Sequence, residues 1–541
     1  MPLPARVQQP ERTWNDIVNM STTSDMAIPD AGARAAPPLR GATLALLTFA
    51  LSLATFIEVL DSTVTNVAVP SIAGSLAVSN SQATWVISSY SVAAAIAVPL
   101  TGWLSQRIGE ARLFVWSVLL FTLTSLLCGM AGNLELLVAC RAMQGLCSGP
   151  MVPLSQAILL RAFPPQRRVL ALALWAMTVL LAPIFGPVLG GWIIDQFSWP
   201  WIFFINLPIG LFAFAACAAL LRREPPDPHQ PPMDVMGIVL LVVGVGALQG
   251  VLDLGRDHGW FDSSLIVGLS LIAALALVSL LIWESAEPYP VIDLSLFRDR
   301  TFSFGVAIIS LGMVSFSVIG VIFPLWLQTV MGYTAFQAGL TVAPLGILAL
   351  VFSMLVGMFL DRFDARVVTS FGFLVFFAVL SWDAHFTLTM SFWQIVTPTF
   401  IQGIGLPCFF IPLSAAILSR IPNEKLAAAS GLSNFLRTLS AAFGTALSVT
   451  WWDNRAAHHY GNLAQSVTHA STGTSLFMRS LQTLGLGPNQ LAAVRSVVEQ
   501  QAYMMATNDL FYMASLVCLA LALLMWATRP WRGISAARAG H

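Results

Sequence analysis

The sequence predicts an all-α polytopic membrane protein with fourteen transmembrane helices, arranged as two six-helix bundles plus two inserted helices. The composition supports this class, because the 541 residues are 57% hydrophobic and only 10% charged. Soluble domains have about 25% charged residues. Apolar runs of about 20 residues also recur along the chain, and that length crosses a bilayer as a helix. The third observation is an internal repeat, described below.

The apolar runs place the expected spans in order. They cover about residues 43–68, 82–104, 112–131, 134–162, 167–194, 201–221, 235–253, 264–284, 301–328, 336–360, 366–382, 392–418, 426–452 and 508–527. The tails and the loops on one side hold 20 of the 26 lysines and arginines, and the loops on the other side hold four. Because basic loops stay in the cytoplasm, we expect both termini there.

The internal repeat relates the first six spans to the last six. The segment from Gly102 to Arg107, after the second span, has a counterpart from Gly357 to Arg362, 255 residues later. Three further pairs repeat at nearly the same offset: Pro70 and Pro324, Gln82 and Gln337, Gln144 and Gln402. Two parallel halves related by an axis along the membrane normal describe the major facilitator fold.

This repeat predicts the domain organisation. We expect a disordered cytoplasmic tail at 1–41, an N-terminal bundle at 42–222, inserted helices at 223–297, a C-terminal bundle at 298–528 with a periplasmic loop at 453–507, and a cytoplasmic tail at 529–541.

Charged residues inside spans are candidates for proton coupling. Asp61 lies in the first span, and a carboxylate at that depth costs about 2.5–3.5 kcal/mol on insertion scales. Glu58 lies three residues earlier on the same helix face. Arg141 in the fourth span requires a partner in apolar surroundings. The alternative interpretations are a structural hydrogen-bond partner for Asp61 and a snorkelling side chain for Arg141.

Small residues and turn residues are candidates for gating. The fifth span contains LLAPIFGPVLGG, in which glycines four apart share one helix face that lets another helix approach. An ordinary packing seam is the alternative. The repeated turns add polar and basic residues that either gate the halves or only fix topology. The gating candidates are Gly102, Gln106, Arg107, Gly186, Pro187, Gly190, Gly191, Asp361 and Arg362.

We expect a substrate cavity between the halves at the bilayer midplane. The candidate substrate-binding residues are Asn66, Tyr90, Gln144, Phe323, Gln328, Gln402, Phe409, Asn434 and Arg437. Phe316, Trp326 and Phe410 are expected to complete its aromatic wall. For Arg437, a structural pairing is an equal alternative.

The sequence gives no argument for catalysis, a cofactor or a metal. It has no G-x-x-x-x-G-K-[ST] phosphate loop, so ATP does not drive the protein. The six cysteines lie in apolar runs without zinc-ligand or disulfide spacing, and a net charge of zero does not suggest nucleic acid.

Several motifs together resemble one known group. The stretch GPVLGG in the fifth span is followed by a turn, Asp195 to Gly210, that contains Trp199 and Trp201; an interfacial aromatic belt would also explain these two residues. Further matching text is Asp293-Leu-Ser-Leu-Phe297 and Leu426-Ala-Ala-Ala-Ser430. From about residue 42 to 527, the chain resembles the fourteen-span drug:proton antiporters of the major facilitator superfamily, of EmrB type. Gln106 departs from that family's usual aspartate, which puts a charge-based latch there in doubt.

The resemblance implies a proton-coupled antiporter in the bacterial inner membrane that exports hydrophobic or amphipathic drugs and toxic compounds. It also implies partners, a periplasmic adaptor of EmrA type and an outer-membrane channel of TolC type, and we expect residues 453–507 to contact the adaptor. The alternatives are an exporter or facilitator of one specific metabolite or fatty acid, and a membrane sensor or enzyme that transports nothing.

Overall fold

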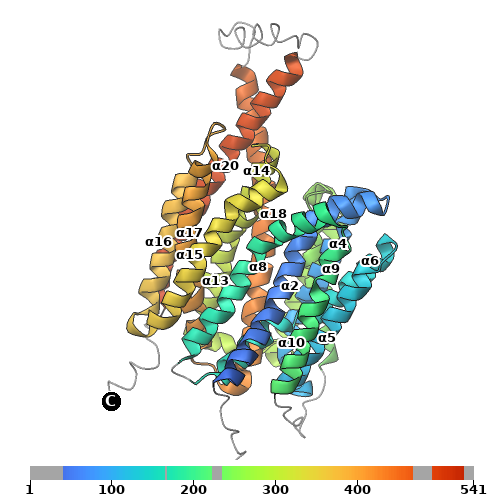
Figure 1. Ribbon diagram of the computed structural model, residues 1–541, viewed down its shortest axis with the longest axis vertical. Helices are drawn as coiled ribbons and strands as arrows, with labels where there is room; N and C mark the ends of the chain where they lie inside the picture. The colour runs from blue at the N-terminus through green and yellow to red at the C-terminus, as the bar shows by residue number, and fades with distance from the viewer. Residues whose placement is uncertain (1–40, 165–166, 222–233, 467–489, 529–541) are drawn as a thin grey trace, which may run out of the picture. The chain divides into compact units, whose positions relative to one another are not determined.

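The computed structural model describes residues 41–164, 167–221, 234–466 and 490–528, and within these ranges every regular element is a helix (Figure 1). The predicted tails lie outside the described residues. The main helices are α2 (Ala42–Ser75), α4 (Trp85–Ile108), α5 (Glu110–Gly129), α6 (Leu134–Ser148), α7 (Met151–Ala162), α8 (Arg168–Gln196), α9 (Trp201–Phe204), α10 (Asn206–Leu220), α11 (Val235–Leu254), α12 (Ser264–Ala286), α13 (Arg300–Ser317), α14 (Phe323–Thr329), α15 (Ala335–Phe359), α16 (Ala365–Asp383), α17 (Phe392–Leu418), α18 (Leu426–Ser466) and α20 (Gln490–Leu524).

Each predicted span coincides with one helix or with consecutive helices. Eleven helical spans of the described chain are long and apolar enough to cross a membrane, and the bent helix α8 makes a twelfth. The fourth predicted span is not among them, because the helix breaks at Gly149 and Pro150 and leaves two helices, α6 and α7, that are each too short to cross a membrane. The thirteenth is α18, which becomes polar toward its end. Fourteen spans therefore remain a prediction.

The helix contacts repeat between the first half (α2 to α10) and the second half (α13 to α20). In the first half α2 packs on α8 and α10, and α6 packs on α4 and α5. In the second half α13 packs in the same way on α18 and α20, and α17 packs on α15 and α16. Figure 1 shows α15, α16 and α17 together, separated by α8 from α5 and α10. The predicted sequence repeat therefore corresponds to a repeat of packing.

Glycine allows the two halves to approach closely. The halves meet through α4 on α18 and through α8 on α15. A Cβ on Gly102 of α4 would lie 2.8 Å from the Ala428 Cα of α18, and a Cβ on Gly357 of α15 would lie 2.7 Å from the Ala173 Cβ of α8. Both contacts lie at the end of the helices that holds Arg107 and Arg362, called here the arginine-rich end. The halves are therefore closed against each other at that end.

The described parts of the segment predicted as a loop at 453–507, residues 453–466 and 490–507, are helical. Helix α18 continues without a break to Ser466, and α20 already begins at Gln490. The 41 residues of α18 make a helix about 60 Å long, about twice the thickness of the bilayer core. Hydropathy could not show this, because a polar sequence can continue a helix into water. We call residues 452–466 and 490–509 the hairpin, which lies at the opposite end from the arginine-rich end.

Side chains hold the two helices of the hairpin together. Asp509 Oδ2 accepts from Arg455 Nε at 2.6 Å and lies 2.8 Å from His459 Nε2. Trp452 Nε1 donates to Thr507 Oγ1 at 2.9 Å. The base of the hairpin therefore has a fixed geometry of its own.

Gly186 of α8 gives a test of the first-half packing. A Cβ there would overlap the side chain of Thr63 on α2, whereas a Cβ on Gly191 would meet nothing within 4 Å. We expect Gly186→Leu to lower the free energy of unfolding by about 1–3 kcal/mol through overpacking. Gly191→Leu, in the same motif, should be neutral or slightly stabilising. Thermal unfolding midpoints in detergent measure the difference, and equal midpoints would contradict the packing described here.

Candidate functional site

Asp61 is the centre of a buried polar network inside the first half. Its side chain is 2% exposed, and Arg141 Nη1 donates to its Oδ2 at 2.6 Å. Its Oδ1 accepts from Asn206 Nδ2 at 2.6 Å and from Gln144 Nε2 at 3.3 Å. These four residues come from α2, α6 and α10, so the network joins three helices.

Arg141 has partners on several sides. Its Nε donates to the Val86 carbonyl at 3.1 Å, and Nη1 also donates to Gln144 Oε1 at 2.8 Å. The guanidinium carbon lies 4.2 Å from the Tyr90 ring centroid and 5.6 Å from that of Phe203. Arg141 is 1% exposed, so it does not snorkel.

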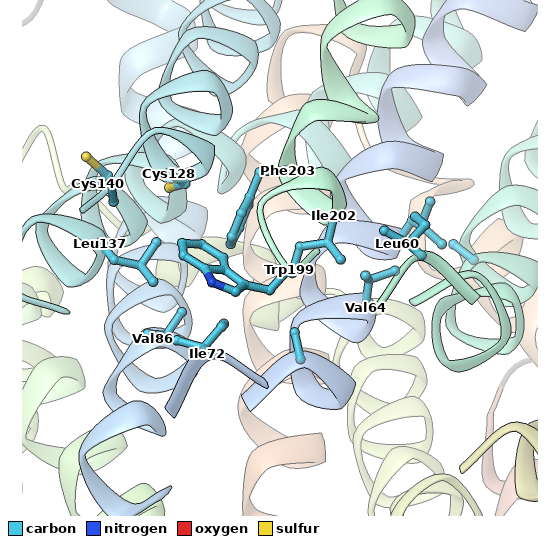
Figure 2. Close-up of a cluster of buried hydrophobic side chains, with 14 residues drawn as sticks. Leu60, Val64, Ile72, Val86, Cys128, Leu137, Cys140, Trp199, Ile202 and Phe203 are labelled. Carbon is cyan, nitrogen blue, oxygen red and sulfur yellow. The ribbon is translucent and has the colours of Figure 1, made fainter. Parts of the chain in front are cut away.

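An apolar cluster surrounds this network. Figure 2 shows Val86, Cys128 and Phe203 within it, together with Trp199. Trp199 is 5% exposed and packs edge-on against Phe203, which differs from a position in an interfacial aromatic belt. Trp201 is 50% exposed and keeps that interpretation. In such a buried, apolar environment, removing one partner of the ion pair strongly destabilises the fold.

Glu58 lies next to the network but is only loosely held. Tyr90 Oη donates to Glu58 Oε1 at 3.4 Å, while Glu58 Oε2 is buried and has no hydrogen-bond partner. Tyr90 also lies under Arg141, so it links the two acidic residues of α2. The three predicted proton-coupling residues are therefore brought together, with Glu58 as the least satisfied of them.

Arg437 of α18 is the second arginine within the predicted spans. Its guanidinium carbon lies 5.2 Å from the Phe410 ring centroid and 5.9 Å from that of Trp175. Trp175 belongs to the first half and stacks on Phe410 of the second. Among the described residues, no ion pair includes Arg437. An arginine beside two stacked aromatic rings at the junction of the halves can interact with an anionic group of a ligand.

Polar contacts close the junction beside Arg437. Gln156 Oε1 of α7 accepts from Asn434 Nδ2 at 3.0 Å and from Ser430 Oγ at 2.5 Å. Gln156, Trp175, Asn434 and Arg437 line a cavity of about 10 Å³, the size of one water molecule. Asn434 therefore contributes to closing the halves in this conformation.

Three predicted wall residues lie elsewhere. Phe323 packs with Trp326 and Phe511, and Phe409 packs on Phe373 and Phe376, all within the second half. These side chains form the core of that bundle rather than a cavity wall, because aromatic faces bury more apolar area against one another.

The other predicted substrate contacts divide between interior and surface. Gln144 belongs to the Asp61 network, and Gln402 is 1% exposed with its Nε2 unpaired. Asn66 and Gln328 are exposed, and Gln328 Nε2 donates to the Pro324 carbonyl at 3.1 Å. Phe316 is half-buried against Phe376. This conformation does not bring the predicted residues into one cavity.

The gating candidates have distinct positions. Gly186 and Gly190 lie against Thr63 and Val64 of α2, within one half. The residues next to them on α8 meet the second half, because a Cβ on Gly339 of α15 would lie 3.1 Å from Val188 Cγ2 and 3.8 Å from Pro187 Cβ.

The repeated turns lie at the arginine-rich end. Arg107 and Arg362 lie over the rings of Trp103 and Phe359. Gln106 is exposed, and the side chain of Asp361 lies outside what the structure describes. Arg161 pairs with Glu110 at 2.8 Å and also donates to the Asn423 carbonyl of the second half. The ion pair of Glu110 and Arg161 therefore lies within the first half, and Arg161 reaches the second half through the Asn423 carbonyl rather than through position 106.

Sequence reasoning missed Asn206, Ser125 and Gln156. Asn206 Nδ2 reaches both Asp61 and Ser125 Oγ, and Gln156 joins the halves. Each is a polar residue within an apolar run, which is a signal that the sequence contains but that does not name a partner. Groups of three or more His, Cys, Asp or Glu residues suited to a metal are absent from the described ranges.

Comparison with known proteins gives one consistent family. Residues 51–445 match the model of the Major Facilitator Superfamily. The chain is 44% identical to the probable multidrug resistance protein EmrY of Escherichia coli K12 over 498 residues, covering 91% of this chain and 97% of the relative. The multidrug export protein EmrB of the same organism is 43% identical over 91% of this chain and 97% of its own.

Two further comparisons extend this result. The fatty acid resistance protein FarB of Neisseria gonorrhoeae is 42% identical, with 91% of this chain and 98% of that protein covered. Among solved structures, the proton:xylose symporter XylE superposes with a TM-score of 0.57 at 15% identity, covering 91% of this chain and 97% of XylE. That likeness concerns the fold alone.

The ion pair of Asp61 and Arg141 gives a stability test. Removing one partner leaves the other charge buried, so we expect Arg141→Ala to destabilise the protein by about 3–5 kcal/mol. The double variant Asp61→Asn with Arg141→Gln carries no charge and should be more stable than Arg141→Ala alone. Thermal unfolding in detergent gives both values. If the double variant were as unstable as the single one, the ion pair would not be the main source of the loss.

Proposed function

The chain belongs to the major facilitator superfamily, and from this premise we propose that it is a proton-coupled antiporter that exports hydrophobic or amphipathic compounds. The observation that carries the proposal is the buried network of Asp61, Arg141, Gln144 and Asn206, with Glu58 beside it. Intramembrane ionisable residues mark ion pathways in transport proteins. The relative named as a multidrug export protein, EmrB, supports the choice of export over import.

We propose that the protein lies in a bacterial inner membrane, with the arginine-rich end facing the cytoplasm and the hairpin in the periplasm. The closed contacts of Gly102, Arg161 and Gln156 with the second half then make this the conformation that faces the periplasm. In this conformation a proton from the periplasm binds Glu58 Oε2 first, since this buried oxygen has no partner.

In the next step the proton moves from Glu58 to Asp61. Neutral Asp61 loses its ion pair with Arg141, so the three helices joined by the network can rearrange. The protein then opens toward the cytoplasm, where Asp61 releases the proton and substrate enters. One charge moving across 100 mV supplies about 2.3 kcal/mol before any pH gradient is added. Once Asp61 has released the proton, its ion pair with Arg141 can form again.

The proposal is tested with Asp61→Asn in proteoliposomes. Asparagine mimics the protonated carboxyl, so the variant should bind a fluorescent cationic dye but fail to concentrate it. It should also lose proton release on substrate addition in detergent. Asp257→Asn, in the exposed loop between α11 and α12, is the matched control and should keep both properties. Uphill transport by Asp61→Asn at a near wild-type rate would place the proton carrier elsewhere, with Glu58 the next residue to replace.

A second candidate function is export of one specific metabolite, in particular a fatty acid. Arg437 favours it, because an arginine beside the stacked rings of Trp175 and Phe410 suits the carboxylate of an amphipathic anion. The likeness to the fatty acid resistance protein supports the same reading. The same transport assay separates the two functions, since a fatty acid exporter would concentrate the acid and leave the dye untransported.

We further propose that the hairpin binds a periplasmic adaptor of EmrA type, which would connect the protein to an outer-membrane channel of TolC type. The hairpin extends beyond the bilayer, and its base is fixed by the contacts of Asp509 and Trp452. A rigid projection suits docking because little conformational entropy is lost on binding.

Deleting residues 464–485 tests the adaptor contact. The contacts at the base of the hairpin lie outside this deletion, so the fold should persist. We expect co-purification with the adaptor to be lost while dye binding in detergent stays at the wild-type level. A deletion of the same length in the N-terminal tail is the control. Unchanged co-purification would show that the adaptor binds elsewhere.

A further inference from the structure

The chain between α12 and α13 crosses the arginine-rich end between the two halves. We call residues 287–299 the strap. Val291 of the strap is 5% exposed and lines a small cavity together with Gly102 of the first half and Ala428 of the second. Asp293 pairs with Lys425, at the start of the second-half helix α18, at 2.6 Å. The strap thus touches both halves where they close.

Two buried acidic residues lie where the inserted helices meet the strap. Asp234, 7% exposed, precedes α11, and its Oδ1 accepts from the Gly237 amide at 2.8 Å and from Trp283 Nε1 at 2.9 Å. Glu284, 4% exposed, lies near the end of α12, and its Oε2 accepts from the Ile292 amide of the strap at 3.3 Å. One oxygen of each carboxyl group is therefore satisfied.

The two remaining oxygens converge. Asp234 Oδ2 and Glu284 Oε1 are both buried without a hydrogen-bond partner. A Cβ on Gly237 would lie 2.8 Å from Glu284 Oε1 and closer still to Asp234 Oδ2, so both oxygens lie over this glycine. Only a residue without a side chain leaves room for the pair.

Two neighbouring carboxylates cannot both stay ionised in a buried site, and they commonly share one proton. None of the ion pairs in the described ranges includes Asp234 or Glu284. A divalent cation requires more oxygen ligands than two, and the described residues offer no group of three acidic, His or Cys ligands. A shared proton satisfies both oxygens with no further group.

We propose that Asp234 and Glu284 form a second proton-binding site, separate from Asp61, that holds one proton between their facing oxygens and anchors the strap. Protonated, the pair keeps Glu284 in position to accept from the Ile292 amide. On loss of the proton, two adjacent negative charges repel, Glu284 moves, and the strap loses this contact. The site thereby reports the proton concentration on the arginine-rich side to the place where the halves close.

Other charged groups near the strap do not replace this pair. Glu284 also lines a cavity of about 520 Å³ with Glu287, Asp293, Arg298 and Lys425, which connects the site to water. Although burial alone would raise the pKa of Asp293, hydrogen bonds from Lys425 and Ser295 hold this pKa below its usual value. Asp293 therefore stays ionised when the pair titrates. Glu287 is the remaining acidic neighbour and serves as the control.

The experiment has a direct and a structural readout. Infrared difference spectra between mildly acidic and mildly alkaline pH should contain a protonated-carboxyl band that is lost in both Asp234→Asn and Glu284→Gln. For the structural readout, spin labels replace Tyr289 of the strap and Val367 of α16, both exposed, in a chain without its native cysteines. In the otherwise native chain, the distribution of distances between the two labels should broaden as pH rises.

In the amide variants, the distribution of distances between the labels should stay narrow at every pH. In each variant the new amide can donate to the facing carboxylate as the shared proton does, while the bond from Ile292 is kept. Glu287→Gln should titrate like the native chain. The proposal is overturned if the carboxyl band remains in both variants, or if the label distance does not depend on pH in the native chain.

Discussion

The first half of the protein depends on one ion pair that is buried among apolar side chains. Asp61 and Arg141 are almost fully buried beside an apolar cluster, so burying either charge without the other would be strongly destabilising. Their hydrogen bonds recruit Gln144 and Asn206, so helices α2, α6 and α10 are joined by polar contacts as well as by packing. Because lipid provides no hydrophobic drive between helices, such contacts together with glycine seams determine which helices lie together.

The second half has no equivalent ion pair at the corresponding depth among its described residues. Its interior is aromatic instead, with Phe323, Trp326 and Phe386 in one group and Phe373 and Phe409 in another. The shared contact pattern of the halves therefore supports different interiors. The first half is joined by a buried ion pair, whereas stacked aromatic side chains fill most of the interior of the second half.

Much of the fold could be predicted from the sequence, because membrane helices are encoded by local hydropathy. The repeat from Gly102 and Gly357 also predicted how the halves correspond. The direction in which individual side chains point could not be predicted in the same way, because the rotation of a helix about its axis depends on neighbours that one sequence does not reveal. Phe323 and Phe409, for example, lie inside a bundle instead of lining a cavity. Asp61 and Arg141 were predictable since an isolated charge requires a partner, whereas the contribution of Asn206 depends on a contact 145 residues away.

Helix α18 is continuous from Leu426 to Ser466, and this continuity has a mechanical consequence. One stiff rod contains the closing contacts of Ala428, the junction residues Asn434 and Arg437, and the base of the hairpin. A small tilt at the junction of the halves becomes a larger sweep at the far tip, as with a lever. The coupling is reciprocal. A protein that binds the end of α18 would shift the equilibrium between the two conformations of the transporter, and that equilibrium would change the affinity for the bound protein by the same factor.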